Sequence, residues 1–168
     1  NFDAVNALVK EKDIAMVLVG PEAPLAAGIV DALKPSGAMV FGPCKDAARL
    51  EASKKFSKEF MERHAIPTAT YRAFTDATSA KAYVDEVGVP LVVKADGLAA
   101  GKGVTVALDR EMAIQAIDDA MVTGVFGDAG AEIIIEGFLE GEEASILAFS
   151  DGKTVIPMAS SQDHKPAF

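Results

Sequence analysis

The chain has 168 residues, 50% of them hydrophobic, and a formal net charge of -9 at pH 7, which allows one ordinary domain or two small ones. This acidic balance argues against a nucleic-acid partner, which needs a basic face, and no apolar run approaches the roughly 20 residues of a membrane span. The single cysteine, Cys44, fits a reducing cytoplasm, and the start at Asn1 without methionine or a basic leader leads us to expect a piece of a longer cytoplasmic protein.

The first third of the sequence alternates between helix and strand patterns. Residues 3–10 are typical of the end of a helix, and residues 15–19 form a short apolar run before Gly20, as buried parallel strands do. Residues 22–33 carry apolar side chains at helical spacing, and residues 38–41 form a second apolar run. Strand, helix and strand in about 30 residues make a βαβ unit. We therefore expect α/β structure here, as the end of a larger parallel sheet.

Residues 46–64 predict one amphipathic helix that links the two halves of the chain. Ala52, Phe56 and Phe60 recur at every fourth position and so share one face of this helix. Pro67 ends the pattern, because proline cannot continue a helix. We place a domain boundary just before this proline.

The second half changes to a pattern in which strands follow one another. Helices are predicted at 79–87 and 109–121, and the Asp-Gly pair at 151–152 is a hairpin turn signal. Strands are predicted at 91–94, 104–107, 133–135, 145–149 and 154–158. This succession predicts an α+β fold with an antiparallel sheet. The two domains are expected to span residues 1–66 and 67–168.

A glycine-rich loop at residues 97–103 is the strongest chemical signal in the sequence. Its three glycines let the backbone approach a ligand closely, and its amides can donate to phosphate oxygens. Lys94 and Lys102 add positive charge to the same place. The glycine spacing and the following strand exclude a Walker A loop and a Rossmann fingerprint. A phosphate cradle and a plain hairpin loop with a solvated lysine both remain open.

Three further segments carry weaker signals. Residues 136–145 follow a predicted strand and contain carboxylates that suit ribose hydroxyls, although a solvated acidic loop is the alternative. Residues 20–25 follow a parallel strand, where open α/β sheets bind ligands. Glu22 suits an amine or a sugar hydroxyl there, and a proline-started helix with an acidic first turn is the alternative. Residues 160–165 form a polar cluster that is equally compatible with a loop.

Seven segments, in this order and spacing, resemble the glycinamide ribonucleotide synthetases (phosphoribosylamine–glycine ligases), a family of the ATP-grasp superfamily. The matching segments are residues 20–25, 41–43, 50–54, 94–103, 126–130, 141–145 and 161–165. They are spread over nearly the whole chain. The resemblance implies that residues 1–66 are the C-terminal part of a substrate-binding α/β domain with its linking helix. Residues 67–168 would then be an incomplete ATP-grasp nucleotide-binding subdomain.

The resemblance also implies roles for individual residues. Those implied to bind the nucleotide are Lys54, Lys94, Gly97, Leu98, Ala99, Ala100, Gly101, Lys102, Gly103, Glu136, Phe138, Leu139 and Glu143. Those implied to line the phosphoribosylamine site are Gly20, Pro21, Glu22, Pro24 and Leu25. Lys102, Asp163 and Lys165 are the implied catalytic residues. Within the nucleotide site, Lys54 and Lys94 would reach the phosphates and the loop would close over them. Glu136 and Leu139 would contact the adenine edge, and Glu143 would hold the ribose.

The implied activity is the ATP-dependent joining of glycine to 5-phosphoribosylamine through a glycyl phosphate, the second step of de novo purine synthesis. Mg²⁺ or Mn²⁺ would assist, with ligands outside this sequence, so no metal ligand is assigned within it. We expect a monomer with these two small-molecule substrates as partners, and no ligase activity for the isolated chain. Another ATP-grasp carboxylate–amine ligase of purine synthesis and a non-catalytic nucleotide-binding fragment remain as alternatives.

Overall fold

A computed structural model describes residues 1–99 and 101–162. The chain divides into two compact units, Asn1–Phe138 and Leu139–Phe168. The domain boundary expected between residues 66 and 67 lies inside the first unit and stays a prediction. No helix in the described part of the chain is both long and apolar enough to cross a membrane.

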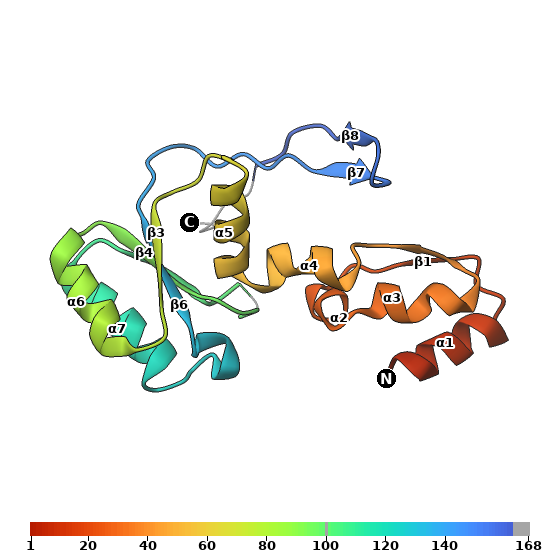
Figure 1. Ribbon diagram of the computed structural model, residues 1–168, viewed down its shortest axis with the longest axis horizontal. Coiled ribbons are helices and arrows are strands. Elements are labelled where there is room, and N and C mark those ends of the chain that lie inside the picture. Colours follow the sequence, from red (N-terminus) through yellow and green to blue (C-terminus); the bar gives the residue numbers. More distant parts are fainter. Residues whose placement is uncertain (100, 163–168) are drawn as a thin grey trace. The chain divides into compact units, whose positions relative to one another are not determined.

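The first unit begins with the predicted strand–helix–strand segment, drawn in red and orange in Figure 1. Its elements are α1 (Phe2–Glu11), β1 (Met16–Leu18), α2 (Glu22–Ala27), α3 (Ile29–Leu33), η1 (Lys34–Ser36) and β2 (Met39–Phe41). β1 and β2 pair in parallel, with Met16 opposite Met39, which confirms the βαβ unit. The single helix predicted at 22–33 is wrong, because Gly28 takes a left-handed φ of 92° and divides it into two short helices.

The linking helix is also divided, at Ser53. The prediction of one helix over residues 46–64 is wrong: α4 spans Lys45–Ala52, α5 spans Lys54–Arg63, and Ser53 between them is extended at φ -137° and ψ 114°. The Ser53 hydroxyl accepts the amide of Phe56 at 3.1 Å and so caps α5. A serine in the middle of a helical pattern therefore marks the start of a second helix.

Replacing Ser53 by alanine is expected to lower the free energy of unfolding by about 1 kcal/mol, because an amide of the first turn of α5 then loses its acceptor. Denaturant unfolding of the wild type and the variant measures this difference. Ser57→Ala in the middle of α5 is the matched control and should change the free energy of unfolding by less than about 0.5 kcal/mol. Equal losses from both substitutions would contradict the capping role.

A four-stranded antiparallel sheet forms the rest of the first unit. Its elements are β3 (Tyr71–Phe74), α6 (Ala77–Val87), β4 (Leu91–Ala95), β5 (Val104–Ala107), α7 (Arg110–Met121), η2 (Gly127–Gly130) and β6 (Ile133–Gly137). The strand order is β3-β6-β4-β5, and each neighbouring pair is antiparallel. The structure thus confirms the antiparallel sheet expected after the parallel one.

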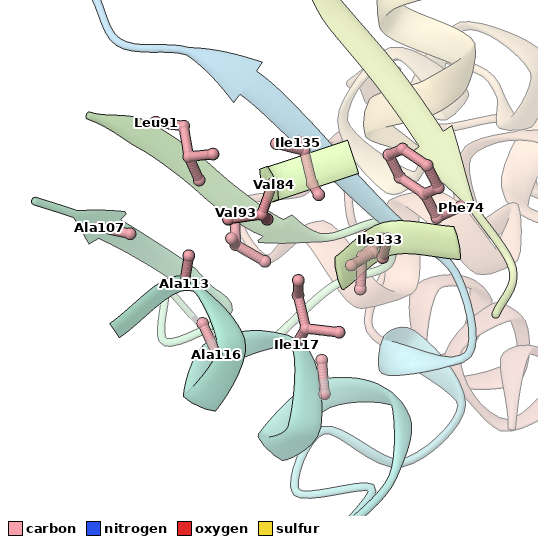
Figure 2. Close-up of a cluster of buried hydrophobic side chains, with 12 residues drawn as sticks. Phe74, Val84, Leu91, Val93, Ala107, Ala113, Ala116, Ile117, Ile133 and Ile135 are labelled. Atoms are coloured by element: carbon pink, nitrogen blue, oxygen red, sulfur yellow. The ribbon is translucent and has the colours of Figure 1, made fainter. Parts of the chain in front are cut away.

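Helices α6 and α7 cover one face of this sheet (Figure 1). The main hydrophobic core lies between these two helices and the sheet. Figure 2 shows side chains that meet in this core, among them Phe74, Val84, Leu91, Val93, Ala113, Ala116, Ile117, Ile133 and Ile135. β6 is buried on both faces. Because side chains alternate along a strand, Ile133 and Ile135 face these helices while Glu136 points to the opposite face. There it meets Lys58 of α5.

The second unit contains a β-hairpin. β7 (Ala148–Ser150) and β8 (Val155–Pro157) pair antiparallel, which confirms the hairpin predicted around residues 151–152, with shorter strands than expected. The carboxylate of Asp151 accepts the amides of Lys153 and Thr154 at 2.8 and 2.7 Å and closes the turn.

Candidate functional site

The glycine-rich loop joins β4 to β5, and its three glycines are needed for different reasons. Gly101 has a φ of 74°, which favours glycine. A Cβ atom on Gly97 would lie 2.9 Å from the Cα of Ala129, and one on Gly103 would lie 2.6 Å from the Cβ of Ala99. The loop base is therefore packed too closely for any side chain at these two positions.

Several backbone amides of the loop are available to a ligand. The amide of Gly97 donates to the carbonyl of Ala129 at 3.2 Å and is therefore occupied. The amides of Leu98, Ala99 and Gly101 donate to no other residue within the described ranges 1–99 and 101–162. Neighbouring amides that have no acceptor among the described residues form a suitable cradle for an anion.

Lys54, the first residue of α5, lies directly against this loop. Its Nζ donates to the carbonyls of Gly97 at 3.1 Å and of Asp96 at 3.3 Å. Burial lowers the pKa of the Lys54 ammonium below its usual value, and the charge of Asp96 opposes that change. The Asp96 carboxylate also accepts the amide of Lys55 at 2.6 Å. The start of α5 and the base of the loop are thus held together.

Lys94, on β4, is joined to Glu136 on β6. Its Nζ lies 2.9 Å from Glu136 Oε2. The sheet register explains this contact, because Lys94 stands opposite Ile134, two residues from Glu136 on the same face. A second lysine, Lys58 of α5, approaches the same oxygen at 3.2 Å. The Glu136 side chain, expected at the adenine edge, is therefore engaged by two cations.

The loop and the segment 20–25, both predicted as binding elements, share a pocket of about 430 Å³. Glu22, Glu51 and Lys54 contribute charged groups to its lining, and the other lining residues are Ala23, Leu98, Ala99, Gly101, Gly103 and Val104. A cation, two carboxylates and open amides around one pocket can hold a molecule that carries both a negative group and an amine.

A smaller pocket of about 50 Å³ lies between the loop and the first third of the chain. Leu98 lines it together with Leu25 of the segment 20–25 and with Glu22, Pro43, Ala48, Glu51 and Ala52. Most of this lining is apolar, so Leu98 faces an apolar surface of the first third of the chain.

The other predicted site residues line neither pocket, belong to the second unit or lie outside the described residues. Gly20, Pro21 and Pro24 line neither pocket. The Lys102 side chain is exposed and has no ion pair within residues 1–99 and 101–162. Phe138 ends the first unit, and Leu139 and Glu143 belong to the second, where both are exposed. The other predicted positions, Ala100, Asp163 and Lys165, lie outside the described residues.

The sequence analysis predicts no site role for three residues that the structure places at the site: Lys58, Asp96 and Glu51. Lys58 stands four residues after Lys54, so the two lysines share one face of α5, and this spacing is a signal that could have found it. Asp96 lies inside the recognised loop segment, but its capping of α5 is a long-range contact. Glu51 lies inside the matching segment 50–54, but only the fold shows that it lines the pocket.

The described residues offer cations for phosphate but no ready metal site. Lys54, Lys94 and the open loop amides provide the donors that phosphate oxygens require. Within residues 1–99 and 101–162, no group of three or more His, Cys, Asp or Glu side chains is placed to hold a metal ion.

Comparison with known proteins places the chain in one family along its whole length. The family model "Phosphoribosylglycinamide synthetase, N domain" matches residues 1–51, and "Phosphoribosylglycinamide synthetase, ATP-grasp (A) domain" matches residues 52–168. The chain is 57% identical to the phosphoribosylamine–glycine ligase of Listeria monocytogenes over 159 residues, 95% of this chain and 38% of that protein. The corresponding protein of Halalkalibacterium halodurans is 55% identical over 168 residues, 100% of this chain and 39% of that protein. The chain thus spans less than half the length of these relatives.

Solved structures agree with this comparison. The phosphoribosylamine–glycine ligase of Thermotoga maritima matches with a TM-score of 0.68 and 32% identity over 72% of this chain and 31% of that chain. The biotin carboxylase domain of the 2-oxoglutarate carboxylase of Hydrogenobacter thermophilus reaches a TM-score of 0.77 over 95% of this chain and 36% of that chain. At 21% identity this second likeness shows the fold alone. The predicted fold class is confirmed: the end of a parallel-sheet domain is followed by part of an ATP-grasp domain with an antiparallel sheet.

Proposed function

Because this chain belongs to the phosphoribosylglycinamide synthetase family, we propose that the full-length protein joins glycine to 5-phosphoribosylamine and cleaves ATP to ADP and phosphate. The relatives that carry the name phosphoribosylamine–glycine ligase support this activity. The observation that carries the proposal within the chain is that Lys54 and the open amides of the glycine-rich loop lie around one pocket, where burial lowers the pKa of Lys54 and the charge of Lys94 is near enough to lower it further. These groups favour a polyphosphate over an uncharged ligand.

The same site suits the other reactants. The segment 20–25 shares its pocket with the loop, so a substrate held there lies next to the phosphate cradle. Glu22 and Glu51 provide carboxylates that can accept hydrogen bonds from an amine or from sugar hydroxyls. Phosphoribosylamine carries both kinds of group. We therefore assign this pocket to the amine substrate, at the border of the loop.

The reaction proceeds in two steps in this proposal. The carboxylate of glycine attacks the γ-phosphoryl group of ATP, so that glycyl phosphate forms and ADP leaves. The amine of phosphoribosylamine then attacks the acyl carbon, loses a proton, and phosphate leaves. Lys54 and Lys94 neutralise charge on the phosphoryl oxygens, and the loop amides hold them in position. Lys102, exposed on the loop, is free to join them.

The proposal includes a divalent cation but assigns it no ligand in this chain. Mg²⁺ or Mn²⁺ bound to ATP would neutralise phosphate charge during transfer. Within the described part of the chain, no cluster of three candidate ligands stands ready for it. The groups that the described residues offer to the phosphates are lysines and loop amides. The cytoplasmic location and the monomeric state stay predictions.

An assay of ADP release by the full-length protein tests the proposed function. ADP release that requires both glycine and phosphoribosylamine is the expected result. ADP release that depends on bicarbonate in place of glycine would contradict it and would indicate a different carboxylate–amine ligase. The isolated 168-residue chain is expected to show no turnover with the same reactants.

A further inference from the structure

Lys58 is a buried lysine to which the proposed reaction assigns no role. Lys58 and Glu136 are the two buried charged residues within the described ranges, and they contact each other. Lys58 Nζ lies 2.7 Å from Thr68 Oγ1, 3.3 Å from the Ala69 carbonyl and 3.2 Å from Glu136 Oε2. The contacts with Thr68 and Ala69 are hydrogen bonds and use two of the three N–H donors of the ammonium, whereas the contact with Glu136 is an ion pair. Lys58 is thus held inside the protein by two hydrogen bonds and one ion pair, and at 5% exposure it is not accessible to a ligand.

Lys94 shares the same carboxylate oxygen but is placed differently. Its side chain is 27% exposed, compared with 7% for that of Lys58. Within residues 1–99 and 101–162, Glu136 is its only hydrogen-bond or ion-pair partner, which leaves two of its N–H donors open. Of the two lysines on Glu136, Lys94 is therefore the one that can turn toward a phosphate.

The free-energy cost of moving the Lys94 side chain from Glu136 to a phosphate depends on Lys58. If Lys94 were the only cation at Glu136, its departure would leave a buried carboxylate without a partner, which is strongly unfavourable. Because Lys58 already compensates Glu136, Lys94 can exchange this contact for a phosphate oxygen. The two lysines and one carboxylate also carry a net positive charge, whereas Lys94 and Glu136 alone would be neutral.

We propose that Lys58 is a positioning residue that holds the Glu136 carboxylate and thereby releases Lys94 to bind the phosphates of the nucleotide. The proposal rests on the proposed function, since it requires a nucleotide at Lys94. Lys58 itself does not touch the nucleotide, so its effect passes through Glu136 and Lys94.

A double-mutant cycle on the full-length protein tests this role by calorimetric binding of ATP and of adenosine. Lys58→Met should weaken ATP binding about tenfold, the size of one charge-assisted hydrogen bond, and leave adenosine binding within about twofold. In a Glu136→Gln background no buried carboxylate needs compensation, so adding Lys58→Met should change ATP affinity by no more than about threefold. Lys58→Arg should retain most of the affinity for ATP.

Lys55→Met is the matched control, because Lys55 lies on the same helix and pairs with Glu132 at 2.7 Å, away from Glu136. It should leave ATP affinity unchanged. Equal loss of ATP and adenosine binding in Lys58→Met, or the same tenfold loss in both backgrounds, would show a merely structural role and overturn the proposal. If Lys58→Met alone does not fold, Glu136→Gln alone decides: removing the carboxylate's charge releases Lys94, so ATP affinity should be kept or increased, and a tenfold loss of ATP affinity would overturn the proposal. A wild type that binds no ATP would refute the proposed function instead.

Discussion

Replacing Lys94 by methionine in the full-length protein is expected to weaken ATP binding about 10- to 150-fold, which corresponds to about 1.5–3 kcal/mol for a lost charge-assisted hydrogen bond. Lys94 lies on β4 next to the glycine-rich loop, with two N–H donors open in the described structure. Methionine preserves the length of the side chain but removes the charge and all donors. The loss should grow with the number of phosphates on the ligand, from adenosine to ATP. Titration calorimetry with each ligand measures it.

The matched control is Lys81→Met, on α6 at the opposite face of the sheet. Lys81 is a lysine of similar exposure, paired with Asp118 at 2.6 Å. We expect its replacement to leave ATP affinity within about twofold, since exposed ion pairs of this kind contribute little. An unchanged ATP affinity in Lys94→Met, with the control also unchanged, would remove Lys94 from the phosphate site.

Replacing Ile133 by alanine is expected to destabilise the fold by about 2–5 kcal/mol, the usual cost of such a truncation in a core. Ile133 is 0% exposed and lies on β6, the strand that pairs with both β3 and β4 (Figure 2). The cavity would open between the sheet and helices α6 and α7, where the surrounding residues can relax little. Denaturant unfolding of the wild type and the variant measures the difference.

Ile146→Ala supplies the control with the same chemical change at a position that is 73% exposed. Its effect on the free energy of unfolding should stay within about 0.5 kcal/mol. A loss of under 1 kcal/mol for Ile133→Ala would contradict the placement of β6 at the centre of the core.

The sequence carries most of the information about secondary structure, because buried strands are short apolar runs. The run at residues 133–135 lies within β6, and the run at residues 38–41 contains β2. The breaks in the two helices are harder to foresee, because apolar spacing continues through Gly28 and Ser53. Ser53 becomes a cap because Asp96, 43 residues away, also binds it. A contact of this range leaves no local trace.

The candidate site also has a part that the sequence predicts and a part that only the structure shows. The glycine-rich loop is recognisable because its small residues are adjacent in the sequence, and its closeness to Lys54 follows from the family resemblance. The role of Glu136 is different: its position is predicted, but the structure joins its carboxylate to Lys94 and Lys58. Such pairings depend on sheet register and on the docking of α5. Neither can be obtained from one sequence without its fold.

We expect the phosphates of the nucleotide to bind between Lys54, Lys94 and the open loop amides. A crystal structure of the full-length protein with a non-hydrolysable ATP analogue tests it most directly. We predict phosphate oxygens within hydrogen-bond distance of Lys54, Lys94 and the amides of Leu98, Ala99 and Gly101. A nucleotide bound elsewhere, with Lys94 still on Glu136 and the loop amides unoccupied, would contradict the account.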